Sequence, residues 1–177
     1  GANDPVDFLE KFAFDIIDST IDFIPIYKPN LAFFERYGYR GIKVLENIVK
    51  YIDGRSIVIA DAKRGDIGNT CKYYASAILD QMGCDAITVS PYMGSDSILP
   101  FSNIKSKGVF VLCLTSNTSA CELQNDLKDN SPLFVKVAKM VEKINVNGNL
   151  GLVIGATKSN CISQINEHCT DIPYLIP

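Results

Sequence analysis

Residues 56–66 are SIVIADAKRGD, an apolar run that ends in a cluster of charges. The apolar part predicts a buried strand, in which side chains two residues apart share one face. We therefore expect Asp61 and Lys63 to emerge together, and Gly65 to let the backbone turn before Asp66. Charges gathered at a strand end are typical of an active site, although the same residue types also favour a solvated turn.

A second lysine, Lys28, also follows an apolar run, FIPIY at residues 23–27. The active sites of parallel α/β folds lie at the carboxyl ends of the strands. Two lysines at the ends of two separate strands therefore favour a functional site over two unrelated turns.

Strand and helix patterns alternate along the whole chain. The apolar periodicity predicts strands at 23–27, 56–60, 86–89, 109–114, 150–154 and 174–177, and helices around 8–17, 31–34, 42–49, 73–82, 134–141 and 161–168. A loop is expected over 90–103, and residues 115–130 form a polar stretch. Such alternation predicts a parallel sheet buried on both faces. A doubly wound sheet and a (β/α)₈ TIM-type barrel both fit. The charged strand ends, and the lack of a Gly-x-Gly-x-x-Gly helix start, favour the barrel.

The chain is short for eight strand-helix units. Such barrels usually have about 250 residues, and this sequence has 177. We therefore expect residues 1–177 to form a single barrel domain of about six units, which lacks the first strand, the last strand and the loop before it. On this interpretation the sequence is an internal fragment.

Composition narrows the class of protein. The 17 basic and 20 acidic residues give a net charge of −3, without the basic stripe typical of nucleic-acid binding. No apolar run reaches the length of a membrane span, and the first residues do not form a secretory signal, so we expect a cytoplasmic protein. The six cysteines form no Cys-x-x-Cys pair, which predicts buried free thiols rather than a metal site. The single histidine, His168, is expected at the surface.

Five segments carry a resemblance to a known family. They are KPN at 28–30 with AFFE at 32–35, ADAKRGDIGNT at 60–70, PYMG at 91–94, TSN at 115–117 and VIGAT at 153–157. Together they resemble the orotidine 5′-monophosphate decarboxylases over essentially the whole chain. The pattern Asp-x-Lys-x-x-Asp is shared with enzymes that act on sugar phosphates, but the Asp-Ile-Gly continuation and the upstream lysine favour the orotidylate enzymes.

The resemblance implies an enzyme without cofactor or metal that converts orotidine 5′-monophosphate to uridine 5′-monophosphate in de novo pyrimidine biosynthesis. It implies a (β/α)₈-barrel homodimer with shared active sites, a small nucleotide substrate, and neither nucleic acid nor membrane as a partner. By the same resemblance Lys28, Asp61, Lys63 and Asp66 form a charged catalytic tetrad.

The resemblance also implies a set of substrate-binding residues. Ser116 matches the residue that recognises the pyrimidine edge, and Asn30 matches a polar residue of the site. Ile67 and Thr70 match residues that are contributed, with Asp66, across the dimer interface. Pro177 matches the start of a phosphate-binding loop, whose remainder and later arginine are absent from this sequence. Thr118 stands where the family usually has proline.

The charged residues suit decarboxylation without a cofactor. Loss of carbon dioxide leaves an electron pair on carbon, and an ammonium group both stabilises that charge and supplies a proton. Neighbouring carboxylates favour the protonated form of Lys63. They also repel the carboxylate of the substrate more than they repel the product, which favours the transition state. Lys28 would hold the aspartates ionised, or would simply tie two strand ends together.

Three alternatives remain open. The first is a metal-dependent sugar-phosphate decarboxylase or lyase of the same superfamily, which would need further acidic ligands at strand ends. The second is an adhesion module, because residues 64–66 are Arg-Gly-Asp and residues 117–119 form a glycosylation sequon. Both motifs are common by chance. The third is an inactive fragment.

Overall fold

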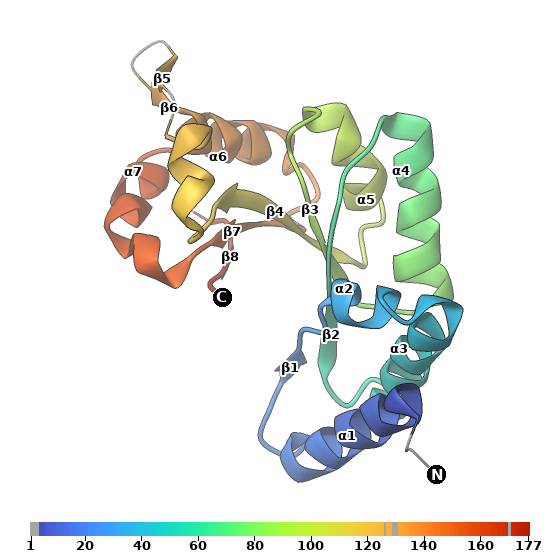
Figure 1. Cartoon of the computed structure of the whole chain (residues 1–177). Coiled ribbons are helices and arrows are strands. Elements are labelled where there is room, and N and C mark those ends of the chain that lie inside the picture. The colour runs from blue at the N-terminus through green and yellow to red at the C-terminus, as the bar shows by residue number, and fades with distance from the viewer. Residues whose placement is uncertain (1–3, 126, 129–130, 170) are drawn as a thin grey trace. The chain divides into compact units, whose positions relative to one another are not determined.

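The computed structural model describes residues 4–125, 127–128, 131–169 and 171–177, and it contains two compact units. The first unit holds residues 1–62 and 76–87, and the second holds residues 63–75 and 88–177. Two strands, β2 (Ile57–Arg64) and β3 (Ala86–Val89), contribute residues to both units (Figure 1).

The strands form a six-membered sheet in the order β1-β2-β3-β4-β7-β8. The other members are β1 (Ile26–Tyr27), β4 (Gly108–Leu114), β7 (Leu150–Ile154) and β8 (Tyr174–Leu175). The pairs β1–β2, β4–β7 and β7–β8 are parallel. This order and the intervening helices confirm the predicted α/β fold, with six of the strands of a (β/α)₈ barrel.

Strand lengths differ from the prediction at three places, of which the last is β8, where the strand expected over 174–177 covers only Tyr174–Leu175. The run 23–27 gives a strand only at residues 26–27, because Pro25 lies inside the run and proline cannot donate to a ladder. The second strand continues through the charged motif to Arg64, four residues beyond the predicted end at Ala60.

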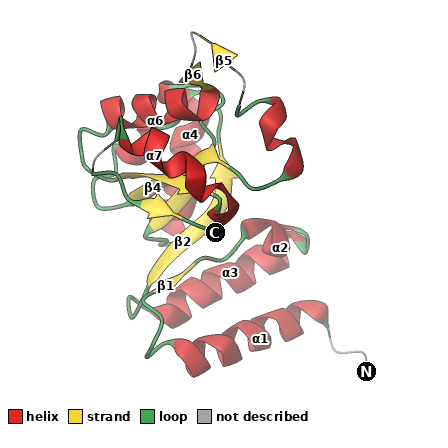
Figure 2. Cartoon of the chain, turned by 90° about the vertical axis from the view of Figure 1, so that its left-hand side faces the viewer, coloured by secondary structure: helices red, strands yellow, loops and turns green. Residues whose placement is uncertain are grey.

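The helices of the first unit are α1 (Pro5–Thr20), α2 (Leu31–Glu35) and α3 (Gly38–Ile52), with a π-helix at Ser76–Gln81. Figure 2 shows these three α-helices side by side, and α3 packs against both α1 and α2. The Asp4 carboxylate accepts the Val6 N–H at 2.9 Å and so caps α1, as Asp followed by Pro predicts. Leu45 and Ile52 on the apolar face of α3 are fully buried.

The second unit contains α4 (Gly68–Ala75), α5 (Leu99–Ser102), α6 (Leu133–Ile144) and α7 (Ile162–Asn166). Short 3₁₀ helices lie at Ser95–Ser97, Thr118–Glu122 and Ala156–Cys161. The helix α6 packs on β4 and β7. Val109, Val111 and Cys113 of β4 are buried, whereas Phe110 and Leu112 between them are half-buried.

Two predictions are corrected, the loop over 90–103 and the start of the helix expected around 73–82. Residues 90–103 were expected as a loop but include a 3₁₀ turn and α5, which begins at Leu99-Pro100, where proline suits a first helical turn. The helix expected around 73–82 begins at Gly68. The stretch 115–130 contains a 3₁₀ helix and β5 (Leu127–Lys128), which pairs antiparallel with β6 (Ser131–Pro132).

The cysteines and the histidine lie much as predicted. Six free thiols are present, of which Cys71, Cys84, Cys113 and Cys169 are buried, Cys161 is intermediate and Cys121 is exposed. His168 is exposed. Within the described ranges no helix combines the length and apolar character needed to cross a membrane.

Candidate active site

The first unit places Lys28 against Asp61. The Lys28 ammonium lies 3.3 Å from the Asp61 carboxylate, whose residue is 8% exposed. The placement follows from the backbone, because the Asp61 N–H donates to the Pro29 carbonyl at 2.9 Å and Asn30 forms a parallel bridge with Asp61. A half-buried ion pair at a strand end is therefore built by the chain segment that directly follows β1.

Asn30 has a structural task as well as a place in a cavity. Its side-chain oxygen accepts the Ala32 N–H at 3.1 Å and caps α2. Lys28 and Asn30 both line a cavity of about 460 Å³ between α1, β1, α2 and α3. The remaining wall is apolar, with Phe12, Ile16 and Phe33 among its residues.

Within the charged motif at residues 61–66, Lys63 is the first residue that belongs to the second unit. Its φ is +48°, in the left-handed region, although the residue lies inside β2. A non-glycine residue there costs about 1–3 kcal/mol and persists only when the surroundings hold it. The two-residue alternation that predicted a shared face for Asp61 and Lys63 does not apply, because it assumes extended backbone at both residues. The turn lies at Lys63, and Gly65 does not have positive φ.

The strand β3 holds this turn in place. The Lys63 N–H donates to the Thr88 hydroxyl at 2.9 Å, and the Ser90 N–H donates to the Arg64 carbonyl at 2.7 Å. Gly65 passes so close to Ser90 that a Cβ at residue 65 would lie 3.1 Å from the Ser90 Cβ. Glycine at residue 65 therefore favours the close approach to Ser90 and does not supply a positive φ.

Asp66 leads into α4. Its carboxylate accepts the Ile67 N–H at 2.7 Å, and its carbonyl accepts the Cys71 thiol at 2.9 Å. Burial raises the pKa of the Cys71 thiol. Ile67 is 64% exposed and Thr70 is half-buried. Asp66, Ile67 and Thr70 thus gather at the start of one helix, where Ile67 is exposed and Asp66 and Thr70 are half-buried.

The ends of β4, β7 and β8 meet in the second unit. The Gly155 N–H donates to the Leu114 carbonyl at 2.8 Å, and the Ala156 N–H donates to the Pro177 carbonyl at 3.3 Å. A Cβ on Gly155 would lie 3.0 Å from the Ser116 Cβ. The predicted substrate-binding residues Ser116 and Pro177 are therefore brought to the same edge of the sheet, and both are exposed.

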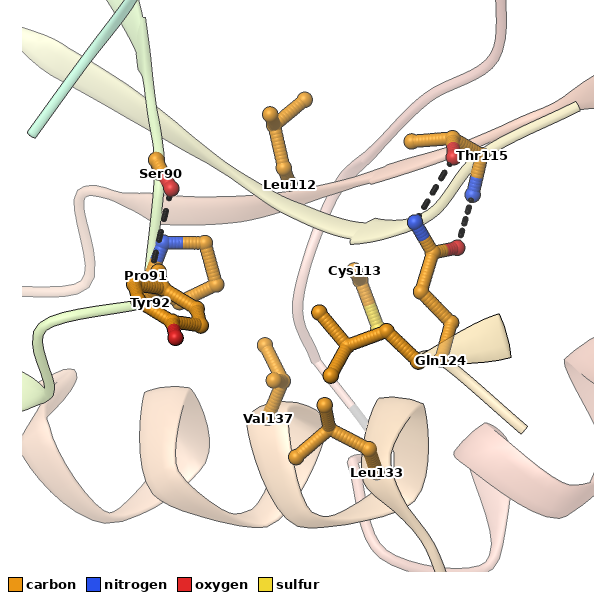
Figure 3. A pocket seen from close by; sticks show the side chains of 10 residues that line it. Ser90, Pro91, Tyr92, Leu112, Cys113, Thr115, Gln124, Leu133 and Val137 are labelled. Atoms are coloured by element: carbon orange, nitrogen blue, oxygen red, sulfur yellow. Dashed lines mark hydrogen bonds between the residues drawn. The ribbon is translucent and has the colours of Figure 1, made fainter. Parts of the chain in front are cut away.

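Gln124 fixes the backbone next to Ser116. Its carboxamide accepts the Thr115 N–H and donates to the Thr115 hydroxyl, both at 2.8 Å (Figure 3). The same hydroxyl donates to the Asn117 side chain at 2.6 Å. Thr115 and Gln124 form the polar end of a cavity of about 450 Å³. Its wall also includes Cys113, and burial raises the pKa of that thiol to about 12.

The structure therefore divides the predicted site residues into local groups. Lys28, Asn30 and Asp61 belong to the first unit. The second unit contains two groups, namely Lys63, Asp66, Ile67 and Thr70 at the end of β2 and the start of α4, and Ser116 with Pro177 at the ends of β4 and β8. Among the residues that the structure describes, no three His, Cys, Asp or Glu side chains are grouped as a metal ion requires.

Two polar residues of these groups were missed by the sequence-based analysis. Thr88 is the only polar residue of the strand AITV at 86–89, and a single polar residue in an apolar run is a signal that the sequence alone offers. In the structure Thr88 is 1% exposed. Gln124 lies in the polar stretch 115–130, where nothing in the pattern distinguishes it from its neighbours.

Comparison with known sequences gives a consistent result. The family described as "Orotidine 5'-phosphate decarboxylase / HUMPS family" matches residues 5–177. The orotidine 5′-phosphate decarboxylase of Herpetosiphon aurantiacus is 47% identical over 164 residues, which are 92% of this chain and 61% of that protein. The enzyme of the same name from Roseiflexus castenholzii is 44% identical over 168 residues, 94% of this chain and 61% of that protein. The chain thus spans less than two thirds of the length of these relatives.

Solved structures agree with the sequence comparison. Leishmania donovani OMP decarboxylase superposes with a TM-score of 0.94 at 37% identity, over 99% of this chain and 71% of that one. Leishmania donovani UMP synthase gives a TM-score of 0.94 at 36% identity, over 100% of this chain and 40% of that one.

Proposed function

Because the chain belongs to the orotidine 5′-phosphate decarboxylase / HUMPS family, we propose that it catalyses the decarboxylation of orotidine 5′-monophosphate to uridine 5′-monophosphate. The observation that carries the proposal is the charged motif at the end of β2. It combines an Asp61 carboxylate paired with Lys28 and a Lys63 held in a left-handed conformation. Strained backbone of this kind concentrates at functional sites.

In the proposed reaction Lys63 supplies both charge and proton. The bond between C6 of the pyrimidine and its carboxylate breaks, carbon dioxide leaves, and the electron pair stays on C6. The Lys63 ammonium stabilises that pair and then transfers a proton to C6 as a general acid. Asp61 and Asp66 repel the substrate carboxylate, and this repulsion disappears as carbon dioxide leaves. No cofactor and no metal enters this sequence of steps.

Lys28 is proposed to keep Asp61 ionised and in place. An ammonium 3.3 Å from a largely buried carboxylate favours the charged form of that carboxylate. The sequence also allowed a purely structural role for Lys28, namely to link two strands. The ion pair with Asp61 fits that role as well. The two roles differ in their effect on turnover.

The substrate is proposed to lie at the carboxyl ends of the strands. Ser116 would recognise the pyrimidine, while Asn30, Ile67 and Thr70 would contact the pyrimidine or the ribose. Pro177 would begin the segment that binds the phosphate. The chain covers 61% of its Herpetosiphon relative. We accordingly propose that residues 1–177 are one barrel domain that needs further strands and the phosphate-binding loop for full activity.

Exposed apolar residues of the unit that contains Asp66 support a homodimer with shared sites. Ile67, Tyr73 and Met93 are 64%, 72% and 51% exposed, and Tyr92 is 81% exposed. All four belong to the second unit, as does Asp66. Large exposed apolar side chains of this kind are typical of protein–protein interfaces. We propose that Asp66 reaches the active site of a second copy of the chain.

Mixing two inactive variants tests the shared site. Lys63→Ala and Asp66→Ala subunits that exchange at random should form heterodimers with one intact site and one site that carries both changes. Activity should reappear at up to about a quarter of the wild-type value per site. If subunit exchange is demonstrated and the mixture stays inactive, both residues serve the site of their own chain.

The decisive experiment is direct assay of orotidine 5′-monophosphate turnover by the purified protein, before and after exhaustive chelation. Turnover that chelation leaves unchanged supports the proposal. The second candidate, a metal-dependent sugar-phosphate lyase, shares the Asp-x-Lys-x-x-Asp pattern at residues 61–66. Turnover of sugar phosphates that magnesium restores, without any turnover of orotidine 5′-monophosphate, would favour that candidate instead. We further propose a cytoplasmic enzyme of the pyrimidine pathway.

A further inference from the structure

The conformation of Lys63 depends on a residue outside the charged motif. Lys63 has a φ of +48°, and its N–H donates to the Thr88 hydroxyl at 2.9 Å. We propose that Thr88 is a positioning residue, whose hydroxyl holds the Lys63 backbone in the left-handed conformation and so directs the ammonium toward the reacting carbon. This inference rests on the proposed function for its catalytic consequence, but not for the hydrogen bond itself.

Packing alone does not account for a hydroxyl at this position. Thr88 is 1% exposed and lies between Ile87 and Val89, which are both fully buried. Valine has the shape of threonine and would fill the same space with an additional methyl group in place of the hydroxyl. A buried hydroxyl is costly unless it is hydrogen bonded. The contact with the Lys63 N–H supplies a reason for its presence.

Threonine is also suited to holding a neighbour still. Its branched Cβ restricts rotation about χ1, so the oxygen is held in a fixed place relative to β3. Positive φ turns the peptide group of a strand residue away from its regular direction, and a side-chain acceptor can then satisfy an N–H that has left the ladder. Thr88 therefore both accepts the hydrogen bond and limits movement of the turn.

A backbone contact fixes the other side of the same turn. The Ser90 N–H donates to the Arg64 carbonyl at 2.7 Å, and Gly65 packs closely on Ser90. These contacts do not involve the Thr88 side chain. A Thr88 variant should therefore leave the strand β3 attached to the segment after Lys63, and it tests the hydroxyl alone.

The variants are Thr88→Val, which removes the hydroxyl at equal volume, and Thr88→Ser, which keeps it. The first measurement is hydrogen exchange of the Lys63 and Ser90 amides by NMR. In Thr88→Val the Lys63 amide should exchange at least about tenfold faster, because its acceptor is lost, while the Ser90 amide is unaffected. In Thr88→Ser both amides should behave as in the wild type. If Thr88→Val does not fold, Thr88→Ala is the hydroxyl-free variant with the same expectation.

The second measurement separates kcat from KM. Displacing a proton donor by about 1 Å costs up to about 100-fold in rate. We expect Thr88→Val to lower kcat about 10- to 100-fold with KM within about twofold, since the lost interaction acts in the transition state. Thr88→Ser should recover most of kcat. A merely structural Thr88 would instead leave kcat intact in every variant that folds.

The outcomes distinguish this inference from the proposed function. If wild-type protein does not decarboxylate orotidine 5′-monophosphate, the proposed function fails and the exchange data alone decide whether Thr88 holds Lys63. If Thr88→Val matches the wild type in both Lys63 exchange and kcat, the positioning role is overturned. Faster exchange at Lys63 without any loss of kcat would overturn the catalytic consequence and leave only the structural contact.

Discussion

Two polar contacts that join the start and the body of α1 to α3 are shorter than the ion pair of Lys28 with Asp61 on β2. Arg40 lies 2.7 Å from Asp4, and the Tyr51 hydroxyl donates to Asp18 at 2.6 Å. The Lys28–Asp61 pair measures 3.3 Å. The helix contacts join side chains on well-formed helices near the surface, whereas the strand-end pair is more buried and adjoins strained backbone. Bond length therefore does not separate a candidate active site from a structural link, but position at a strand end and backbone strain do.

Of the changes that test the difference between the end of β2 and the α1–α3 contacts, Lys63→Ala is expected to have the largest effect on activity. Removing the proton donor should lower kcat/KM by at least about 10²–10⁴-fold, because general acid catalysis alone contributes that much. The variant should still fold, since alanine retains the left-handed strain of residue 63 but adds none. The measurements are steady-state kinetics and thermal unfolding. A loss of less than about tenfold would remove Lys63 from the chemistry.

Lys63→Gly provides the matched control for the strain. Glycine adopts positive φ without a steric cost. The glycine variant should therefore be as inactive as Lys63→Ala but should unfold at a higher temperature, by several degrees. Equal melting temperatures of the two variants would show that the conformation at residue 63 carries little strain.

The second prediction concerns Lys28→Met, which keeps the aliphatic stem and removes the charge. A largely buried Asp61 carboxylate would lose the ammonium at 3.3 Å. Loss of one partner of a buried hydrogen-bonded charge is costly, so we expect kcat to fall about 10- to 100-fold, together with some loss of stability. Kinetics and denaturant unfolding measure the two effects. A loss of stability with kcat unchanged would reduce Lys28 to a tie between strands.

The main strands were predictable from sequence because each contains a nearly continuous apolar run, as expected for strands of a parallel sheet covered on both faces. Lys28 and Asp61 were predictable as a pair because each follows such a run. The conformation of Lys63 was not, since φ at a single lysine depends on tertiary contacts, and the Lys63 N–H donates to Thr88, 25 residues further along the chain. The contact of Gln124 with Thr115 was equally hidden, because it forms inside a polar stretch without periodicity.

The third prediction tests whether the end of β4, like the end of β2, contributes to activity. Gln124→Leu removes both hydrogen bonds to Thr115, which directly precedes Ser116. Since Ser116 is proposed to recognise the pyrimidine, freeing its backbone should raise KM about three- to tenfold and change kcat less. Gln124→Glu is the control, because a carboxylate still accepts the Thr115 N–H, and it should give a smaller rise. Unchanged KM in both variants would separate Gln124 from substrate recognition.

The smallest effect on activity and stability is expected for changes at the α1–α3 contacts. If such a change lowered activity, the distinction between these structural contacts and the candidate active site would be wrong. Arg40→Met removes a guanidinium that lies 2.7 Å from Asp4 and 3.4 Å from Asp7, on a side chain that is 45% exposed. Exposed ion pairs contribute little to stability. We expect kinetics like those of the wild type and a fall in melting temperature of a few degrees at most, which high salt should reduce further.

The pH dependence of this small effect has a definite sign. The hydrogen bond from the Val6 N–H, followed by the Arg40 guanidinium, lowers the pKa of Asp4 from its usual 3.8. A group with a lowered pKa in the folded protein stabilises it above the unfolded value, and this contribution is lost as the pH falls through the folded value. The difference in melting temperature between wild type and Arg40→Met should therefore be present at pH 7 and shrink below about pH 3.8. Asp4→Asn keeps a capping oxygen but no charge, so combining it with Arg40→Met should cause little further loss at any pH. A difference that persists unchanged at pH 2 would assign the effect of Arg40 to its packing rather than to its charge.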